Sequence, residues 1–190
     1  MLFMIGLGNP GSQYANNRHN VGFMLLEEVA RHYGFPAFHT AKAQAEVSTG
    51  TLAEQKTHLI KPTTYMNLSA RAIIPFMQFF KPERKQLLVI HDDLDLPLGK
   101  VRFKFGGGHG GHNGLRSLDE SIGKDYWRLR IGIGHPGTKE RVTGHVLSNF
   151  TSEEHTLLTP LLQKLAERIT LLVLGEQFSD QQFAKVSTNS

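Results

Sequence analysis

The sequence predicts an α/β fold: a single domain with a mixed, mostly parallel twisted sheet sandwiched by helices. Segments typical of strands alternate along the chain with segments whose apolar residues recur at helical spacing. One strand, LLVIH at residues 87–91, is apolar over most of its length, as expected for a strand buried on both faces. The length of 190 residues, 39% of them hydrophobic, suits one core. We therefore expect one domain over residues 1–178, followed by a polar tail over residues 179–190.

The individual elements follow from apolar periodicity, with Gly and Pro as stop signals. Strands are predicted for LFMI, AEVSTGTL, THLIKP, LLVIH, VRFKF and WRLRIGIG, at residues 2–5, 45–52, 57–62, 87–91, 101–105 and 127–134. Helices are predicted over residues 21–33, 67–80, 113–122 and 151–174. Pro75 and Pro160 interrupt two of these helices, and Thr151 and Glu154 have the spacing of a capping box.

Two of the strands combine an apolar face with a basic face. VRFKF alternates so that Arg102 and Lys104 lie opposite its apolar residues, and WRLRIGIG does the same with Arg128 and Arg130. The chain is also mildly basic, with 21 Lys and Arg against 17 Asp and Glu and an isoelectric point near 9.4. We expect these four side chains to face outward and to contact a polyanion. The alternative is a solvated sheet face whose charges pair with acidic residues of neighbouring strands.

The segment GLGNPG at residues 6–11 matches the glycine spacing of a dinucleotide-binding turn. Such a turn requires a helix to begin at once, so that the helix N-terminus faces the phosphates. Residues 12–20 have no apolar face at helical spacing, and Pro10 removes one amide donor from the turn. Dinucleotide binding is therefore disfavoured, and the segment instead supplies polar side chains, among them Asn9, His19 and Asn20.

Composition disfavours several classes of protein. The chain contains no cysteine, which excludes disulfides, thiolate metal ligands and cysteine nucleophiles. No apolar run approaches the length of a membrane span, and the apolar start lacks the basic flank of a signal peptide. We therefore expect a cytoplasmic protein without a membrane partner.

A candidate site follows from the rule that ligands gather at the carboxyl ends of strands in open α/β sheets. If the first, third and fourth predicted strands are parallel, Asn9, Asn67 and Asp92 reach one rim. A neutral imidazole beside an ionised Asp can take a proton from water, so His19 together with the carboxylates that follow residue 91, Asp92, Asp93 and Asp95, indicates hydrolysis by activated water. Each residue also has an ordinary explanation, since His19 could be a loop histidine, Asp92 a turn residue, and Asn67 and Asn113 helix N-caps.

The run GGGHGGHNG at residues 106–114 is either a flexible connector or a mobile flap that closes over a substrate. The flap is favoured, because glycine-rich loops beside sites commonly gate them. His109 and His112, with His91 and the aspartates, raise the alternative of a metal-dependent hydrolase, although no recognised ligand spacing such as H-E-x-x-H is present. A further alternative is an RNA-binding module without catalysis, which would use the basic strand faces and would have no need of a histidine beside carboxylates.

Four segments together resemble, in order and spacing, the signature segments of the bacterial peptidyl-tRNA hydrolase family. They are GLGNPGSQYANNRHNVG, KPTTYMNLSA, HDDLDLPLGKVRFKFGGGHGGHNGLRS and WRLRIGIGHPG, and the resemblance extends from about residue 2 to residue 150. It implies a monomeric α/β enzyme whose domain over residues 1–178 is catalytic. It also implies hydrolysis of the ester between a peptide and the 3′-terminal ribose of tRNA, with no cofactor and no metal.

The resemblance also implies roles for individual residues. The catalytic histidine of the family corresponds to His19 and its orienting aspartate to Asp92. The residues that hold or surround the substrate correspond to Asn9, Tyr14, Met66, Asn67 and Asn113, and the basic tRNA contacts correspond to Arg102, Lys104, Arg128, Arg130 and His135. Asp93, Leu98 and Arg102 depart from the family pattern, in which Glu, Pro and Lys are frequent at these positions, and none of the three belongs to the implied catalytic pair.

Overall fold

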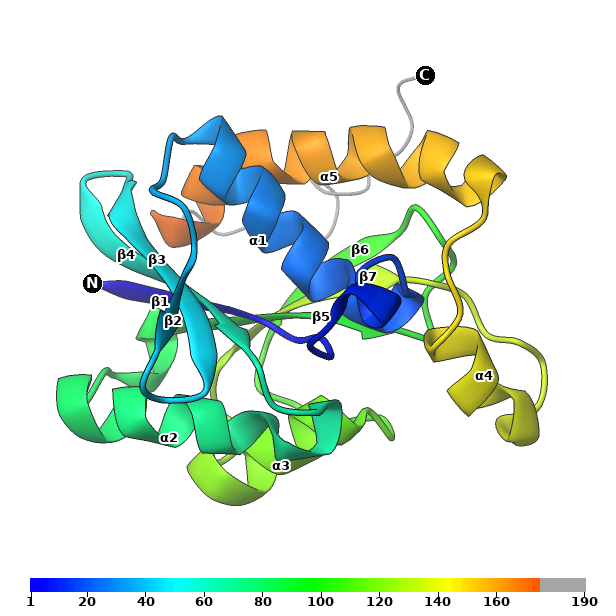
Figure 1. The fold of residues 1–190 in the computed structure, drawn as a ribbon, viewed down its shortest axis with the longest axis horizontal. Coiled ribbons are helices and arrows are strands. Elements are labelled where there is room, and N and C mark those ends of the chain that lie inside the picture. The colour runs from blue at the N-terminus through cyan, green and yellow to red at the C-terminus, as the bar shows by residue number, and fades with distance from the viewer. Residues whose placement is uncertain (175–190) are drawn as a thin grey trace.

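A seven-stranded mixed sheet forms the centre of the structure, which is a computed structural model that describes residues 1–174 (Figure 1). The strand order is β2-β3-β4-β1-β5-β7-β6. The strands are β1 (Leu2–Gly6), β2 (His39–Ala41), β3 (Ala45–Leu52), β4 (Gln55–Pro62), β5 (Leu87–Asp93), β6 (Val101–Phe105) and β7 (Trp127–Gly132).

The parallel strands occupy the middle of the sheet. β4, β1, β5 and β7 pair in parallel, whereas β2 with β3, β3 with β4, and β6 with β7 pair antiparallel. The predicted mixed sheet is confirmed, but the expectation that the sheet is mostly parallel is wrong. Among the described strands, antiparallel pairs at the margins equal the parallel pairs in number, because short connections join β3 to β4 and β2 to β3 directly, and such connections produce antiparallel pairs. The three strands expected to share one rim are parallel, as predicted.

Helices cover both faces of the sheet, as Figure 1 shows. α1 (Val21–His32) and α5 (Ser152–Val173) lie on one face, and α2 (Ser69–Phe80) and α3 (Asn113–Ile122) lie on the other, while the short α4 (Val142–Val146) lies at one end. Each layer buries its own apolar core: Leu25, Leu129 and Leu165 belong to the first, and Ile60 and Leu118 to the second. The sheet therefore needs apolar residues on both faces in its centre, which explains the continuous run in β5.

All the predicted strands and helices are present, and the differences are local. The helix predicted from residue 67 begins at Ser69, because residues Met66–Leu68 form the 3-10 turn η3. β2, α4 and four further 3-10 turns, η1 (Ser12–Tyr14), η2 (Arg18–Asn20), η4 (Arg84–Gln86) and η5 (Lys139–Arg141), were not predicted. These elements are too short to establish a periodic pattern. The polar tail predicted over residues 179–190 lies outside the described residues.

The glycines of the first turn have a packing role. A Cβ at Gly6 would lie 2.5 Å from the carbonyl oxygen of Gly22, and a Cβ at Gly22 would lie 2.5 Å from that of Ile90. α1 therefore begins in direct backbone contact with the ends of β1 and β5. Only the single 3-10 turn η1 follows GLGNPG directly, and α1 starts at Val21, so no α-helix N-terminus faces the turn, which agrees with the rejection of dinucleotide binding. Within residues 1–174, no helix combines the length and the apolar character needed to cross a membrane.

Candidate active site

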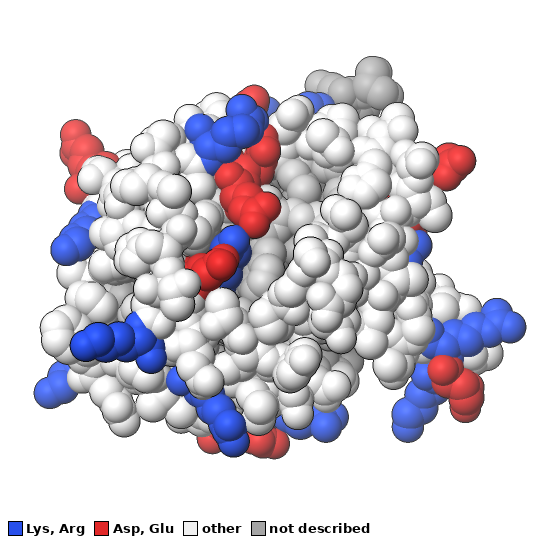
Figure 2. Space-filling view, in the orientation of Figure 1, with Lys and Arg blue, Asp and Glu red and all other residues white. Residues whose placement is uncertain are grey.

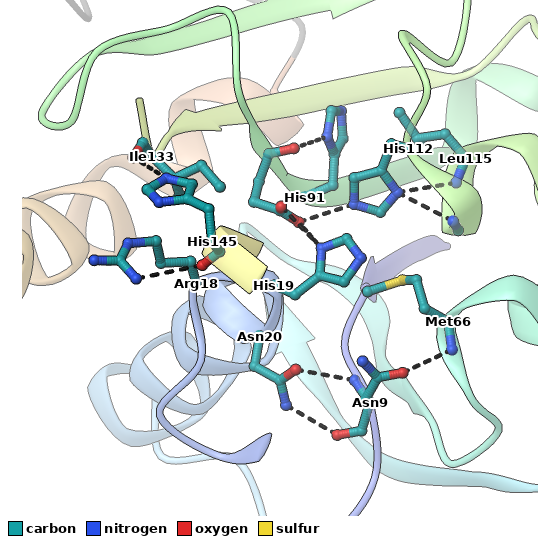
Figure 3. Close-up of polar contacts among 12 residues, drawn as sticks. Asn9, Arg18, His19, Asn20, Met66, His91, His112, Leu115, Ile133 and His145 are labelled. Carbon is teal, nitrogen blue, oxygen red and sulfur yellow. Dashed lines mark hydrogen bonds and ion pairs between the residues drawn. The ribbon is translucent and has the colours of Figure 1, made fainter. Parts of the chain in front are cut away.

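His19 and Asp92 come together at the carboxyl end of the central strands. Asp92 lies near the end of β5, and His19 lies in η2, the turn that immediately precedes α1. Nδ1 of His19 is 2.9 Å from both carboxylate oxygens of Asp92. Figure 3 shows the His19 ring with this hydrogen bond as a dashed line. The backbone of Gly22 lies close to the Ile90 carbonyl oxygen, and this contact brings η2, just before Gly22, against β5. The absence of a side chain at Gly22 therefore positions this pair.

The pair is buried, and its electrostatics favour an ionised carboxylate. Burial works against the charged form of Asp92, but the positive potential and hydrogen bonds of His19 and His112 outweigh it, so the pKa of Asp92 lies well below its ordinary value. Burial also disfavours the imidazolium of His19, yet the charge of Asp92 and the hydrogen bond to it raise the pKa of His19. Since Nδ1 donates to Asp92, Nε2 is the ring nitrogen left to accept a proton in the pocket.

His112 is a second imidazole on the same carboxylate, whereas the sequence suggested it only as a metal ligand. Its Nε2 lies 2.8 Å from Oδ1 of Asp92. Its Nδ1 accepts the backbone N–H groups of Gly114 at 3.1 Å and Leu115 at 3.3 Å, so His112 is the N-cap of α3. An acceptor at Nδ1 requires the proton to lie on Nε2, and His112 therefore donates to Asp92. No sequence signal pointed to this role, because histidine is not a preferred N-cap.

His91 completes the group of rings in Figure 3 without serving as a base. Its Nδ1 lies 2.8 Å from the carbonyl oxygen of Asp92, and its ring centre is 5.3 Å from that of His112. Burial, with a smaller contribution from His112, lowers the pKa of His91 to about 3. His91 is therefore neutral and packs beneath the site.

Asn9 is held rigidly beside His19. Its N–H donates to Oδ1 of Asn20 at 3.0 Å, and the Asn20 amide donates back to the Asn9 carbonyl at 2.9 Å. Oδ1 of Asn9 accepts the N–H of Met66 at 2.8 Å, as Figure 3 shows. Because the side-chain oxygen is already engaged, Asn9 presents its NH₂ group as the free donor.

Asn67 and Asn113 are exposed residues that line the same pocket as Asn9. Neither is a helix N-cap: Leu68 precedes α2, and His112 caps α3. The alternative that they serve only as caps is therefore wrong. In the described part of the chain, no hydrogen bond engages either side-chain amide, so both amides are available to a ligand.

The pocket around these residues has a volume of about 840 Å³. Besides His19, Asp92 and the three asparagines, it is lined by Tyr14 and Met66, both predicted, and by the glycine-rich loop over residues 106–111. α4 supplies a further wall that the sequence did not predict, through Val142, Thr143, Val146 and the adjacent Leu147. The pocket therefore joins a rim of the sheet to a short helix from the C-terminal half of the chain.

Arg18 fixes the turn that carries His19. Its guanidinium donates to the His145 carbonyl at 3.3 Å and to the Ser148 hydroxyl at 2.5 Å, and forms an ion pair with Glu154 at 2.7 Å. The backbone N–H of Arg18 donates to the Ser148 carbonyl at 3.0 Å. Glu154 belongs to the predicted capping box with Thr151, which is present at the start of α5. The segment between α4 and α5 thus holds η2 against β5.

The basic residues of β6 and β7 divide into two groups. Register pairs Arg102 with Arg130 and Lys104 with Arg128, so the four lie on one face of the sheet, as predicted. Arg102 and Lys104 are exposed, and Lys104 and Arg130 line the pocket. Arg130 is only partly exposed and donates from Nε to Asp93 at 2.6 Å.

The prediction that Arg128 faces outward is wrong. Its side chain is 2% exposed, and α3 and the glycine-rich loop cover it. The alternation of residues along β7 correctly placed Arg128 on the same sheet face as Arg130. The sequence of β7 gave no sign that α3 covers this face at Arg128. The Arg128 guanidinium is therefore engaged within the protein, by Asp119 and by the glycine-rich loop, although Arg128 is among the residues that line the pocket.

Charged side chains of both signs lie beyond the two strands, at the end of the molecule that carries α4. Figure 2 shows basic and acidic side chains together on the projection at lower right, where Figure 1 places α4. η5, directly before α4, contains the exposed residues Lys139, Glu140 and Arg141. The charge at this end of the molecule is therefore mixed.

The ligand atoms of His19, Asp92 and His112 lie within 4.8 Å of one another, the grouping closest to a metal site in the described chain. The two imidazole N–H groups that meet the Asp92 carboxylate account for this grouping. The other histidines considered as ligands are engaged elsewhere: His109 accepts the N–H of Gly111, and His91 bonds the backbone of Asp92. Hydrogen bonds from the two imidazole N–H groups to the carboxylate explain why these three side chains lie together, so their grouping does not support the metal-dependent alternative.

Comparison with known proteins supports the resemblance over the whole fold. The chain matches the family model described as Peptidyl-tRNA hydrolase over residues 3–190. A relative from Rhodospirillum centenum with this name is 56% identical over 176 residues, which cover 93% of this chain and 77% of the relative. A relative from Bartonella quintana with the same name is 50% identical over 177 residues, which cover 93% of this chain and 91% of the relative.

A solved structure agrees. The crystal structure of peptidyl-tRNA hydrolase from Acinetobacter baumannii aligns with a TM-score of 0.90 at 41% identity, covering 99% of this chain and 95% of that one. Because sequence and fold match over nearly the full length, and not only in the short signature segments, the chain belongs to the peptidyl-tRNA hydrolase family.

Proposed function

We propose that the protein hydrolyses the ester bond between a peptide, or an N-blocked aminoacyl group, and the 3′-terminal ribose of tRNA. His19 acts as the general base and Asp92 orients it. The single observation that carries this proposal is the buried pair of His19 and Asp92 in a pocket lined by Asn9, Asn67 and Asn113. Family membership supplies the substrate class.

The chemistry follows from the tautomer of His19. Asp92 accepts a hydrogen bond from the Nδ1–H group of His19, so the unprotonated Nε2 can remove a proton from water as the water oxygen attacks the ester carbonyl carbon. The resulting imidazolium is stabilised by the Asp92 carboxylate. When the tetrahedral intermediate collapses, the bond to the ribose 3′-oxygen breaks, and Nε2 returns the proton to this oxygen. An alkoxide leaves far more readily than an amine, so an ester suits this mechanism.

The asparagines explain how a peptide is held without reading its side chains. A carboxamide offers a donor and an acceptor that can pair with any backbone C=O and N–H. The NH₂ group of Asn9 is free to donate, because Met66 already occupies the side-chain oxygen. A charged free α-amino group would leave such amides mispaired, at a cost of about 1 to 3 kcal/mol for each unsatisfied group. Selectivity for an N-blocked aminoacyl group follows.

The test is hydrolysis of an N-acetylated aminoacyl-tRNA beside the same tRNA carrying an unblocked amino acid. We expect rapid release of the acetylated amino acid and slow release of the free one, measured as acid-soluble radiolabel. Equal rates on both substrates would contradict the role given to the asparagines. Binding of tRNA without turnover of either substrate would support the alternative of a non-catalytic RNA-binding module.

The remaining parts of the proposal concern partners and location. We propose that Lys104, Arg130 and Arg102 contact the acceptor end of tRNA, since two of them line the pocket and the third lies beside Arg130 on the same sheet face. Residues Tyr14 and Met66 form walls for the substrate. We also propose that the protein acts as a monomer in the cytoplasm, as the family resemblance implies and as befits an enzyme whose substrate is tRNA.

A further inference from the structure

A buried ionic cluster lies behind the glycine-rich loop, where β7 packs against α3. Nη2 of Arg128 is 2.9 Å from Oδ1 of Asp119, and the two side chains are 2% and 3% exposed. Tyr126 donates its hydroxyl to the same oxygen at 2.7 Å, and the Arg128 guanidinium lies 4.5 Å from the centre of the Tyr126 ring. The desolvation cost of a buried ion pair can exceed its Coulombic gain, so stability alone gives no reason for charges here.

Arg128 uses the rest of its guanidinium to hold the loop. Nη1 donates to the Gly108 carbonyl at 2.9 Å, and Nη2 donates to the Gly107 carbonyl at 2.8 Å. Apart from the turn that His112 closes onto the His109 carbonyl, residues 107–111 make no other hydrogen bond to the remainder of the described chain. Four glycines of this segment, at positions 106, 107, 110 and 111, have positive φ angles. The backbone is thus free to rearrange unless something holds it.

The loop leads directly into two residues of the pocket. His112 follows it and donates to Asp92 at 2.8 Å, and Asn113 comes next and lines the pocket. Hydrogen bonds weaken steeply when they are stretched or misaligned. A displacement of residues 107 and 108 would therefore move His112 and weaken its hydrogen bond to Asp92.

We propose that Arg128 is a positioning residue: by holding the carbonyls of Gly107 and Gly108, it keeps the glycine-rich loop in the conformation in which His112 reaches Asp92. The inference rests on the proposed function, since Arg128 acts on turnover through His112 and Asn113 without touching the substrate. Lysine is a poor substitute, because a single ammonium lacks the planar fork that reaches Asp119 and both carbonyls at once.

The experiment compares Arg128→Lys with the matched control Tyr126→Phe, which alters the same cluster but leaves the loop contacts intact. Amide hydrogen exchange of Gly106, Gly111 and His112, whose N–H groups donate to the Tyr126 carbonyl, to Nδ1 of His109 and to the His109 carbonyl, reports the loop without any substrate. We expect exchange at least about tenfold faster in Arg128→Lys, the factor expected for losing a hydrogen bond to a charged group, and within about twofold of wild type in Tyr126→Phe. On a blocked aminoacyl ester of a terminal nucleoside, kcat should fall by a similar factor in Arg128→Lys alone.

Three results would overturn the proposal. One is unchanged loop exchange in a folded Arg128→Lys protein, and another is an equal loss of kcat in both variants, which would indicate a general structural role. The third is a lower salt dependence of KM for peptidyl-tRNA in the double variant Asp119→Leu/Arg128→Met, which removes the positive charge that Arg128→Lys keeps, because this would indicate a phosphate contact. If Arg128→Lys does not fold, the double variant Asp119→Leu/Arg128→Met removes both charges and is subject to the same measurements. Turnover that survives His19→Ala would instead contradict the proposed function, while the exchange data would still report on the loop.

Discussion

At the residue scale, the site depends on how donors are arranged around one buried carboxylate. Asp92 receives N–H groups from His19 and from His112, and each imidazole is held by a different element. η2 holds the first, and the N-terminus of α3 fixes the tautomer of the second. Of the two imidazoles that donate to Asp92, His19 keeps a ring nitrogen without a partner among the described residues, whereas both ring nitrogens of His112 are engaged.

His19→Ala removes the proposed base. We expect turnover of N-acetylaminoacyl-tRNA to fall by about 10² to 10⁴, the usual loss for a general base, while KM stays close to the wild-type value. Single-turnover kinetics with saturating enzyme would measure the effect on the chemical step. A variant that retains a near-normal rate would remove His19 from the mechanism.

The pH dependence of the reaction tests the coupling of His19 to Asp92. The base must be unprotonated, so activity is lost as the pH falls through the pKa of His19, which Asp92 raises above 6.5 despite burial. We therefore expect the acid limb of kcat/KM to have its midpoint above pH 6.5. In Asp92→Asn burial remains without the opposing charge, so the midpoint should move below 6.5 while kcat falls. A midpoint that does not move would contradict the coupling.

At the scale of elements, the antiparallel pair of β6 and β7 carries the proposed contact with tRNA. Lys104 is exposed beside the pocket, whereas Arg130 is partly neutralised by Asp93. The two residues therefore differ in how freely they can meet a phosphate, even though both lie on one sheet face.

Lys104→Ala and Arg130→Ala should raise KM for peptidyl-tRNA and reduce the slope of its salt dependence, each by about one released ion. The effect should be larger for Lys104, because Arg130 already has an acidic partner. A blocked aminoacyl ester on a terminal nucleoside carries no distant phosphate and should be cleaved as by wild type. Lys56→Ala, an exposed lysine of β4 outside the pocket, is the charge-matched control. Equal losses on both substrates would show that the basic residues support the active site instead.

At the scale of the whole molecule, the site joins segments that are far apart in the sequence. The ends of β1, β4 and β5 supply its floor, His112 and Asn113 come from the N-cap and the first residue of α3, and α4 closes one side. Arg18 links this assembly to α5 through Glu154. No single segment could form the pocket alone.

Chelation tests whether the assembled site works without a metal. The clustered atoms of His19, Asp92 and His112 already satisfy one another by hydrogen bonds, so we expect EDTA to leave hydrolysis unchanged. The measurement is the rate on the nucleoside ester, which avoids the effect of divalent ions on tRNA folding. Inhibition by EDTA that a divalent cation restores would favour the metal-dependent alternative.

The sequence by itself determined the elements and the main residues of the site. Periodicity located the long helices and the strands, because burial of one face imposes a repeat that is visible within a single segment. The parallel centre followed from the apolar run in β5, and the rule that ligands gather at strand ends assigned Asn9, Asn67 and Asp92 to one rim. The family resemblance added the pairing of His19 with Asp92, which the structure contains at 2.9 Å.

Only the tertiary structure decided what covers each face and which partner each polar group takes. Strand alternation put Arg128 on the basic face, but the packing of α3 and the glycine-rich loop over it made Arg128 a buried anchor. His112 became both an N-cap and a donor to Asp92, and α4 became a pocket wall. These outcomes depend on contacts between segments distant in the chain. Periodicity reports the environment of a residue averaged over its own element, and therefore carries no information about which other element arrives there.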